Sequence, residues 1–220
     1  MPTLTRTGDV FVLDIGDTEN RFHPDWLAAV DAALTEVEKA EGARALVTSA
    51  TGKFWSNGLD LDWLSQHPDR FEPYAASVHG LLARVLELPL PTVAAIQGHA
   101  FAAGGMLALC HDFRVMRADR GFFCLPEVDI HIPFTPGMSA LIQARLTPQV
   151  AHEAMTTGKR YGGEAAAAAG IVDATAAEGA VLDVAVERAA GLAGKASPTL
   201  GAIKARMYEG ALRLLREPPA

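Results

Sequence analysis

Hydrophobic and polar positions follow two different periods along the first half of the chain. Short, mostly apolar runs predict strands at 10–15, 44–50 and 91–98. Between them, apolar residues recur every three or four positions, which predicts helices over 23–42 and 73–87. Pro24 suits the first turn of the first helix, and Gly42 suits its end. The pattern therefore predicts strands and helices in alternation.

The second half of the chain changes gradually from this alternation to helix. The stretch 97–112, QGHAFAAGGMLALCHD, begins as a strand, passes through glycine and alanine, and continues as a helix. Strands are predicted over 113–118 and 122–129, and from Thr135 onward 170–175 is the single strand candidate. We predict an α/β fold with a parallel sheet, comprising a core over residues 1–175 and a C-terminal helical region over 176–220 for packing or assembly.

Composition and charge exclude several classes of protein. The 220 residues are 50% apolar and carry a formal charge of -7 without a Lys/Arg cluster, so we expect no nucleic-acid partner. Every apolar run is shorter than the roughly 18 residues of a membrane span, and no leader segment opens the sequence. Cys110 and Cys124 have neither metal-ligand nor disulfide spacing and are expected to be buried. We therefore expect a soluble, cytoplasmic protein without membrane contact.

Two loops follow buried strands and expose backbone. They are 52–60, GKFWSNGLD, and the glycine- and alanine-rich part of 97–112. Small residues let a ligand approach main-chain N–H groups, and the first N–H groups of a helix are unpaired. Alternatively, Gly104 and Gly105 only allow a helix to pack closely on a strand. Neither loop matches a dinucleotide-binding or nucleoside-triphosphate-binding glycine motif.

Three motifs in this order and spacing resemble the crotonase (enoyl-CoA hydratase/isomerase) family. They are FWSNGLDL, PTVAAIQGHAFAAGGMLALCHDFRVMRADRG and LPEVDI, and within the family they are most similar to the plant-type Δ3,Δ2-enoyl-CoA isomerases. The resemblance implies a crotonase-like ββα spiral core and assembly as a homotrimer or a dimer of trimers. It also implies an acyl-CoA thioester as the substrate. CoA is then part of the substrate, and neither a metal nor another cofactor is implied.

The resemblance further implies an oxyanion hole made by the backbone N–H groups of Leu59 and Ala103. Ala103 replaces the glycine that is common there, which affects only the backbone dihedral, because both residues donate an amide. Hydratases of the family use two glutamates, and the first of these positions is Met106. The second is Glu127, which the resemblance makes the catalytic residue. One carboxylate suffices to move a double bond, by removing a proton from C2 and returning it at C4.

The surroundings of Glu127 in the sequence suit a base. It lies in the apolar segment between Phe122 and Ile132, where burial would disfavour the charged carboxylate and raise its basicity. The alternative is an ordinary surface glutamate at a strand end. On a strand, Asp129 would share the face of Glu127, either as an auxiliary acid or in a structural role.

Further residues are predicted to contact the substrate. The predicted substrate-binding set is Asn57, Gly58, Asp60, Gly104, Trp55 and Phe101. Asn57 and Asp60 are expected to shape the turn around the first amide, through side-chain hydrogen bonds to the backbone. The aromatic members of the set, together with Trp63, are expected either to line an acyl tunnel or to belong to the core. Lys53, Lys204 and Arg206 are candidates for contacts with CoA phosphates or are solvated surface charges.

Other chemistry has weaker support. His111 and Asp112 are adjacent, with His99 and His131 nearby, but adjacent helical residues do not face each other, so we expect structural roles. No serine lies in a nucleophile turn. We therefore predict a Δ3,Δ2-enoyl-CoA isomerase. The alternatives are another crotonase reaction, namely hydration, thioester hydrolysis or decarboxylation, and a non-catalytic acyl-CoA-binding protein.

Overall fold

The computed structural model describes residues 1–218 and contains a sheet of six strands. The first two strands form an antiparallel hairpin, and all later neighbours pair in parallel. The order across the sheet is β1 (Thr3–Thr7), β2 (Val10–Asp14), β3 (Ala45–Ser49), β5 (Thr92–Ile96), β7 (Phe113–Arg117) and β9 (Ala174–Ala176). The predicted α/β fold with a parallel sheet is confirmed.

A second sheet of three short parallel strands accompanies the first. Its strands are β4 (Phe54–Ser56), β6 (His99–Phe101) and β8 (Phe123–Cys124), in that order. Each follows a strand of the large sheet along the chain, which gives the successive pairs β3–β4, β5–β6 and β7–β8. Helices follow each pair: α2 (Leu61–Gln66) and α3 (Phe71–Glu87), then α4 (Ala103–Cys110), then α5 (Pro136–Arg145). This repeat of two strands and a helical segment is the predicted ββα spiral.

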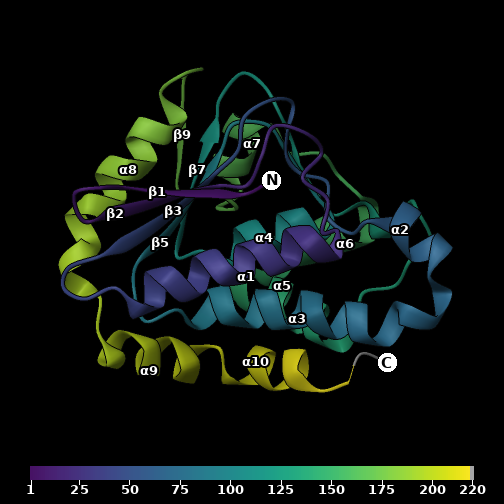
Figure 1. Cartoon of the computed structure of the whole chain (residues 1–220). Helices are drawn as coiled ribbons and strands as arrows, with labels where there is room; N and C mark the ends of the chain where they lie inside the picture. Colours follow the sequence, from purple (N-terminus) through teal and green to yellow (C-terminus); the bar gives the residue numbers. More distant parts are fainter. Residues whose placement is uncertain (219–220) are drawn as a thin grey trace.

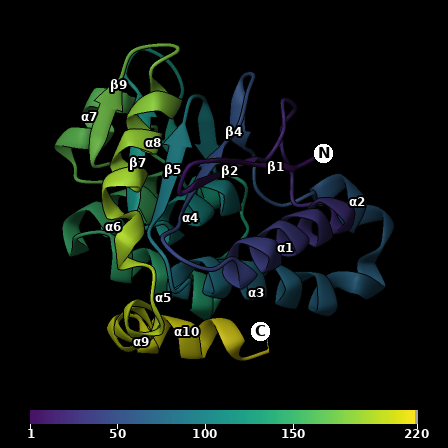
Figure 2. The ribbon, with the colours of Figure 1, turned by 60° about the vertical axis from the view of Figure 1, so that its left-hand side comes forward.

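Helices cover both faces of the large sheet. Helix α8 (Val181–Leu192) lies on one face, whereas α4 and, beyond it, α1 (Pro24–Lys39) and α3 lie toward the other (Figures 1 and 2). Alternate residues of β3 face different layers: Ala45 and Val47 pack in the cluster that includes α8, and Leu46 packs in the main core. Burial on both faces explains why these strands are continuous apolar runs.

The C-terminal helices pack on other helices. Helix α9 (Pro198–Met207) packs on α3, and α10 (Glu209–Arg216) packs on α3 and α5 (Figure 1). The predicted boundary between residues 175 and 176 falls inside β9, and α8 beyond it belongs to the sheet layers. The remaining helices are α6 (Pro148–Thr157) and α7 (Gly163–Ala168), with 3-10 turns at Pro68–Arg70, Pro126–Val128 and Ala193–Lys195.

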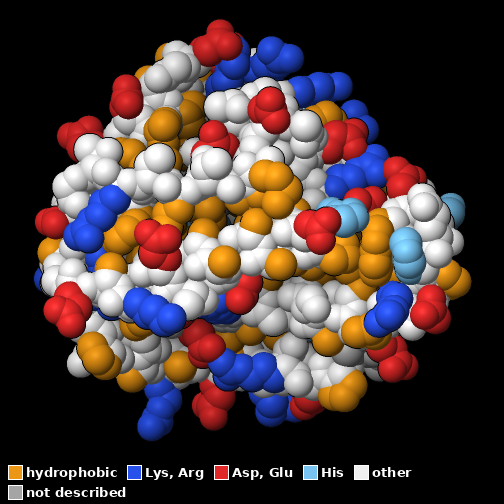
Figure 3. All heavy atoms as spheres, in the orientation of Figure 1, with side chains coloured by type: hydrophobic (Ala, Val, Ile, Leu, Met, Phe, Trp, Pro, Cys, Tyr) orange, Lys and Arg blue, Asp and Glu red, His pale blue; other side chains and the backbone are white. Residues whose placement is uncertain are grey.

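The surface carries mixed charge. Figure 3 shows acidic and basic side chains spread over one face, with apolar side chains between them. Within residues 1–218, no helix combines the length and the apolar character that crossing a membrane requires.

The strand predicted over 122–129 is wrong in its second half. Only Phe123–Cys124 forms a strand, and Pro126–Val128 is a 3-10 turn. Proline has no N–H for a ladder and its fixed φ suits the first position of a helical turn. Glu127 therefore lies in a turn, and the exposed Asp129 after it does not share a strand face with it. The hairpin strand β1 was not predicted, because its mostly exposed Thr-rich sequence lacks an apolar run.

Lys204 has neither of its predicted roles. Its side chain is buried, and its Nζ donates to the carboxylate of Asp112 at 2.6 Å and to the carbonyl of Leu90 at 2.8 Å. The ion pair joins α9 to the residue that precedes β7. A buried, paired ammonium cannot reach a phosphate in solution, so Lys204 is a structural residue. The other two candidates, Lys53 and Arg206, are exposed.

We expect Lys204→Ala to destabilise the fold by about 3 kcal/mol, because it leaves the partly buried Asp112 carboxylate without its cation. Denaturant unfolding measures this loss. Lys195→Ala removes a nearby exposed lysine and is the control, with little expected change. Equal stability of the two variants would contradict the structural role of Lys204.

Candidate active site

A cavity of about 310 Å³ lies where the two predicted loops meet the turn that carries Glu127. Leu59 and Asn57 line it from the loop after β4, and Ala103 lines it from the start of α4. Glu127 lines it from the 3-10 turn after β8. Residues that are distant in the sequence are thus brought to one cavity.

The loop after β4 leaves a single amide free of protein acceptors. The amide of Asn57 donates to the carbonyl of Glu19 at 2.9 Å, and the amide of Gly58 donates to Ser56 Oγ at 3.2 Å. The amide of Asp60 donates to the hydroxyl of Tyr74 at 2.9 Å. Among residues 1–218, the amide of Leu59 has no such partner. It is therefore available to a ligand in the cavity.

The start of α4 supplies a second available amide. The amide of Ala102 donates to the carbonyl of Cys124 at 3.0 Å, and its carbonyl accepts from Met106 at 3.1 Å. Ala103 begins the helix, where N–H groups lack intrahelical acceptors, and no described residue accepts from its amide. Ala103 itself does not have a positive φ, so alanine fits there; the unusual conformation falls on Ala102, with φ 50°.

The two loops touch through their backbones. A Cβ on Gly58 would lie 2.8 Å from the nitrogen of Ala103, and a Cβ on Gly104 would lie 2.4 Å from the carbonyl oxygen of Ser56. Real Cβ atoms do not approach so closely, so both positions require glycine. Gly58 and Gly104 thus bring Leu59 and Ala103 together without lining the cavity themselves.

Glu127 is a buried carboxyl with few polar neighbours. It is 6% exposed, and its Oε2 is buried without a hydrogen-bond partner among the described residues. Burial raises the pKa of Glu127 to about 7, because desolvation disfavours the carboxylate. A carboxyl that titrates near neutrality can both accept and return a proton at physiological pH.

Some of the other predicted contact residues line the cavity, and others do not. Phe101 lines the cavity, whereas Asp60 caps α2 by accepting from the amide of Trp63 at 3.1 Å. Trp55 does not line the cavity: it is 0% exposed in the core, and its Nε1 donates to the carbonyl of Thr48 at 3.4 Å. The predicted substrate contact of Trp55 is therefore corrected. Trp63 lies outside this cavity and lines a different hollow.

The histidines do not form a catalytic group. His111 is fully buried, with ring nitrogens 2.9 Å from the carbonyl of Leu107 and 2.8 Å from Thr48 Oγ1. Burial lowers the pKa of His111 to about 3. His99, which lies on β6, packs against the rings of Phe54, Phe101 and Phe122. In the described part of the chain, no three His, Cys, Asp or Glu side chains are placed to hold a metal ion.

Several residues that line the cavity were not predicted. They come from α2, from the loop after Glu127 and from α5: Leu61, Ile130, Ile132, Phe134 and Met138. A signal was present in part, since Ile130 and Ile132 are apolar residues in a segment without regular periodicity, and both are exposed. Arg21 and Asp62, which form an ion pair, also lie at the cavity.

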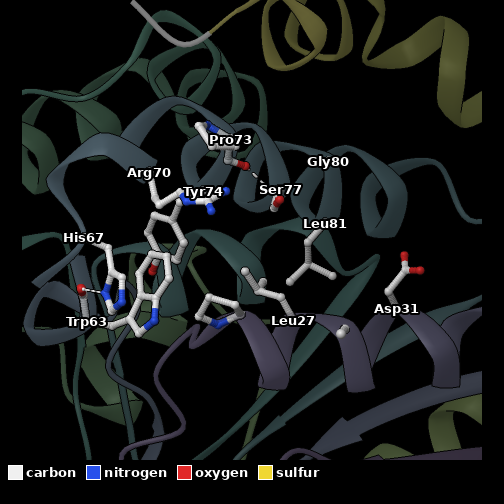
Figure 4. Close-up of a pocket in the computed structure, with 12 residues that line it drawn as sticks. Leu27, Asp31, Trp63, His67, Arg70, Pro73, Tyr74, Ser77, Gly80 and Leu81 are labelled. Carbon is white, nitrogen blue, oxygen red and sulfur yellow. Dashed lines mark hydrogen bonds between the residues drawn. The ribbon is translucent and has the colours of Figure 1, made fainter.

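A second hollow, of about 820 Å³, lies between α1 and α3 (Figure 4). None of the predicted catalytic or oxyanion residues lines it. Its volume alone therefore does not make it the reaction site.

Comparisons with known proteins agree on one family, whose members similar to this chain include isomerases, hydratases and a dehydratase. A family model described as enoyl-CoA hydratase/isomerase matches residues 8–217. Enoyl-CoA delta isomerase 2, peroxisomal, of Arabidopsis thaliana is 42% identical over 186 residues, covering 80% of this chain and 77% of that protein. Enoyl-CoA delta isomerase 3 of the same plant is 43% identical over 192 residues, covering 82% and 80%. The apo enoyl-CoA isomerase structure of Mycobacterium tuberculosis has a TM-score of 0.90 at 30% identity, covering 98% of this chain and 94% of that chain.

These comparisons contradict the expected cytoplasmic location. Two of the plant relatives are named as peroxisomal proteins. Composition and the length of the apolar runs do not distinguish the cytoplasm from a peroxisome.

We expect the raised pKa of Glu127 to reduce stability as pH rises. The folded state holds this proton up to about pH 7, and the unfolded chain holds it only up to about 4.5. The stabilisation is therefore complete below pH 4.5 and is lost as pH rises to 7, by about 3 kcal/mol. Glu127→Gln, which has no such proton, should equal the wild type near pH 4.5 and exceed it at pH 8.

Denaturant unfolding of both proteins between pH 4.5 and 8 measures this difference, and the subtraction removes the titration of all other groups. Parallel stability curves over the whole range would show that the Glu127 carboxyl is not perturbed.

Proposed function

The chain belongs to the enoyl-CoA hydratase/isomerase family and is an isomerase, and we propose that it moves a double bond from the 3 to the 2 position of an acyl-CoA thioester. The family model and the plant relatives confirm the predicted family resemblance. The family acts on acyl-CoA thioesters. The observation that carries the proposal is a single buried carboxyl, Glu127, in the same cavity as two amides without protein acceptors.

In the proposed mechanism, the amides of Leu59 and Ala103 donate to the thioester oxygen. The carboxylate of Glu127 removes a proton from C2, and the electron pair of the C–H bond delocalises onto the thioester oxygen. Preorganised donors stabilise this developing enolate charge more than they stabilise the neutral carbonyl. Glu127 then returns the proton at C4, and the double bond forms between C2 and C3. The proton is conserved, so the reaction needs neither a metal nor a redox cofactor.

The carboxylates around the cavity favour this assignment over hydration. Hydration requires one group to activate water and a second to protonate carbon. Met106, which lines the cavity at the place of the first of the two hydratase glutamates, can do neither. Asp62 also lines the cavity, but its side chain is 79% exposed and is paired with Arg21. Glu127 is thus the one buried carboxyl of this cavity within the described residues.

The oligomeric state is part of the same proposal. The family resemblance implies a homotrimer or a dimer of trimers. The C-terminal helices, which the sequence assigns to packing or trimerisation, leave Ile203 and Met207 of α9 50% and 65% exposed. Size-exclusion chromatography with light scattering measures the number of copies directly.

We expect the wild type to convert 3-hexenoyl-CoA to the conjugated 2-enoyl-CoA. Its kcat/KM should rise with pH and level off above about pH 7, because the free enzyme must hold Glu127 as the carboxylate. Glu127→Gln should lower kcat by at least about a thousandfold, because the amide accepts no proton. The ultraviolet absorbance of the conjugated thioester follows the reaction.

The control is binding of hexanoyl-CoA, which Glu127→Gln should retain nearly unchanged. Folded wild type that forms no conjugated product would overturn the proposed reaction. Turnover that survives in Glu127→Gln would remove Glu127 as the base.

We expect Gly58→Ala to lower kcat by about 10²–10³-fold with little change in KM. The added Cβ would lie 2.8 Å from the nitrogen of Ala103 and would displace one of the two amide donors. Gly170→Ala is the matched control, because Gly170 also has a positive φ, 71° against 78° for Gly58, but has nothing within 4 Å of the added Cβ.

Both variants should lose similar stability from the positive φ, and only Gly58→Ala should lose turnover. Steady-state kinetics and thermal melts of the pair separate the two effects. Equal kcat values in the two variants would contradict the proposed oxyanion hole.

A further inference from the structure

The hollow between α1 and α3 is a slot with an apolar floor. Leu27 of α1 and Leu81 of α3 line its centre, and they are 8% and 6% exposed (Figure 4). Lining residues recur at three- or four-residue spacing along both helices, so the slot follows the line between them. Ser77 on its rim already donates to the carbonyl of Pro73 at 2.8 Å. The centre of the slot therefore presents hydrocarbon rather than polar groups that need partners.

Gly80 keeps this slot open. It lies in the interior of α3, and nothing lies within 4 Å of the place where a Cβ would be. Glycine disfavours helix, and no close packing requires it at this position. Ala28 lines the slot from α1. A large side chain at position 80 would occupy space that a ligand could otherwise fill.

The two ends of the slot differ in chemistry. At one end, the ring of Trp63 stacks on His67 at 4.4 Å and packs against Tyr74 at 5.4 Å, between ring centroids (Figure 4). At the other end, Asp31 lines the slot, and its carbonyl accepts from Arg84, which does not line the slot, at 2.9 Å. The charged end would limit how far an apolar ligand extends, because burying an apolar group against paired charges contributes no binding free energy.

The aromatic end lies next to the candidate active site. Helix α2 separates the two: its Leu61 lines the catalytic cavity, and its Trp63 lines the slot. The hydroxyl of Tyr74, in the wall of the slot, accepts from the amide of Asp60, the residue after Leu59. No residue of α2 is fully buried, and its core contacts are made by the half-buried Trp63 and Leu64. In Figure 3, apolar side chains and histidines gather over this side of the molecule.

We propose that the α1–α3 slot takes the distal end of a long acyl chain, which makes this chain an isomerase of long-chain rather than only short-chain acyl-CoA. The inference rests on the proposed function. The catalytic cavity, at about 310 Å³, is at the lower end of the range for ligand sites, whereas the slot provides about 820 Å³. Helix α2 lines both hollows, through Leu61 and Trp63, so a chain that passes this helix from the first cavity enters the slot.

The test compares 3-hexenoyl-CoA with 3-dodecenoyl-CoA, each below its micellar concentration. In the wild type, kcat/KM should rise by roughly fourfold for each methylene that is buried in the slot. Gly80→Leu should leave the six-carbon substrate unchanged and lower kcat/KM for the twelve-carbon substrate by at least about tenfold. Leucine is a better helix former than glycine, so the variant should fold.

Gly80→Ala is the matched control, because it improves the helix to a similar degree but adds only one methyl group; it should keep the long-chain preference. Binding of hexanoyl-CoA and dodecanoyl-CoA by calorimetry should show the same loss in Gly80→Leu for the longer ligand alone. Equal long-chain kcat/KM in Gly80→Leu and wild type would overturn the slot. Absence of turnover with the six-carbon substrate in the wild type would instead overturn the proposed reaction.

Discussion

The backbone contact between the loop after β4 and the start of α4 is the constraint on which the site depends. Because β4 and β6 pair in parallel, both segments leave the same edge of the small sheet. Gly58 and Gly104 then allow main chain to lie against main chain, at distances that a side chain would forbid. With any larger residue the two loops would separate, and Leu59 and Ala103 would no longer line one cavity.

Hydrogen bonds at both ends of α4 hold this contact in place. Ala102 has a φ of 50°, a conformation that is costly for a residue with a Cβ. Its amide and carbonyl are both hydrogen-bonded, which maintains that conformation. At the far end of α4, Arg145 donates to the carbonyls of Leu109 and His111, both at 2.7 Å. A helix fixed at its last turn presents its first amide in one place, which is what a preorganised donor requires.

The sequence predicted most of this framework and less of the cavity. Apolar periodicity located the main helices and the doubly buried strands, and the glycine-rich motifs located both loops. Periodicity could not predict which aromatic residue faces the substrate, because Phe54, Trp55 and Phe101 lie on strands too short to show alternation. Here Trp55 points into the core and Phe101 into the cavity. Leu61 and Met138 reach the cavity only through tertiary packing of α2 and α5, which no local pattern contains.

Some residues that line the cavity are held more rigidly than others, and this difference suits the proposed chemistry. Ala103 and Glu127 are buried, and they follow β6 and β8, which pair with each other in the small sheet. Leu61 and Ile130, which also line the cavity, are 41% and 45% exposed, and no residue of α2 is fully buried. Proton transfer requires fixed distances between the carbonyl oxygen, the carbon atoms and the base, so these groups belong on the rigid side. Acyl chains differ mainly in length, so the part of the cavity that receives them must change shape to fit different lengths. A helix with two half-buried side chains and none fully buried costs less stability to move than a core helix.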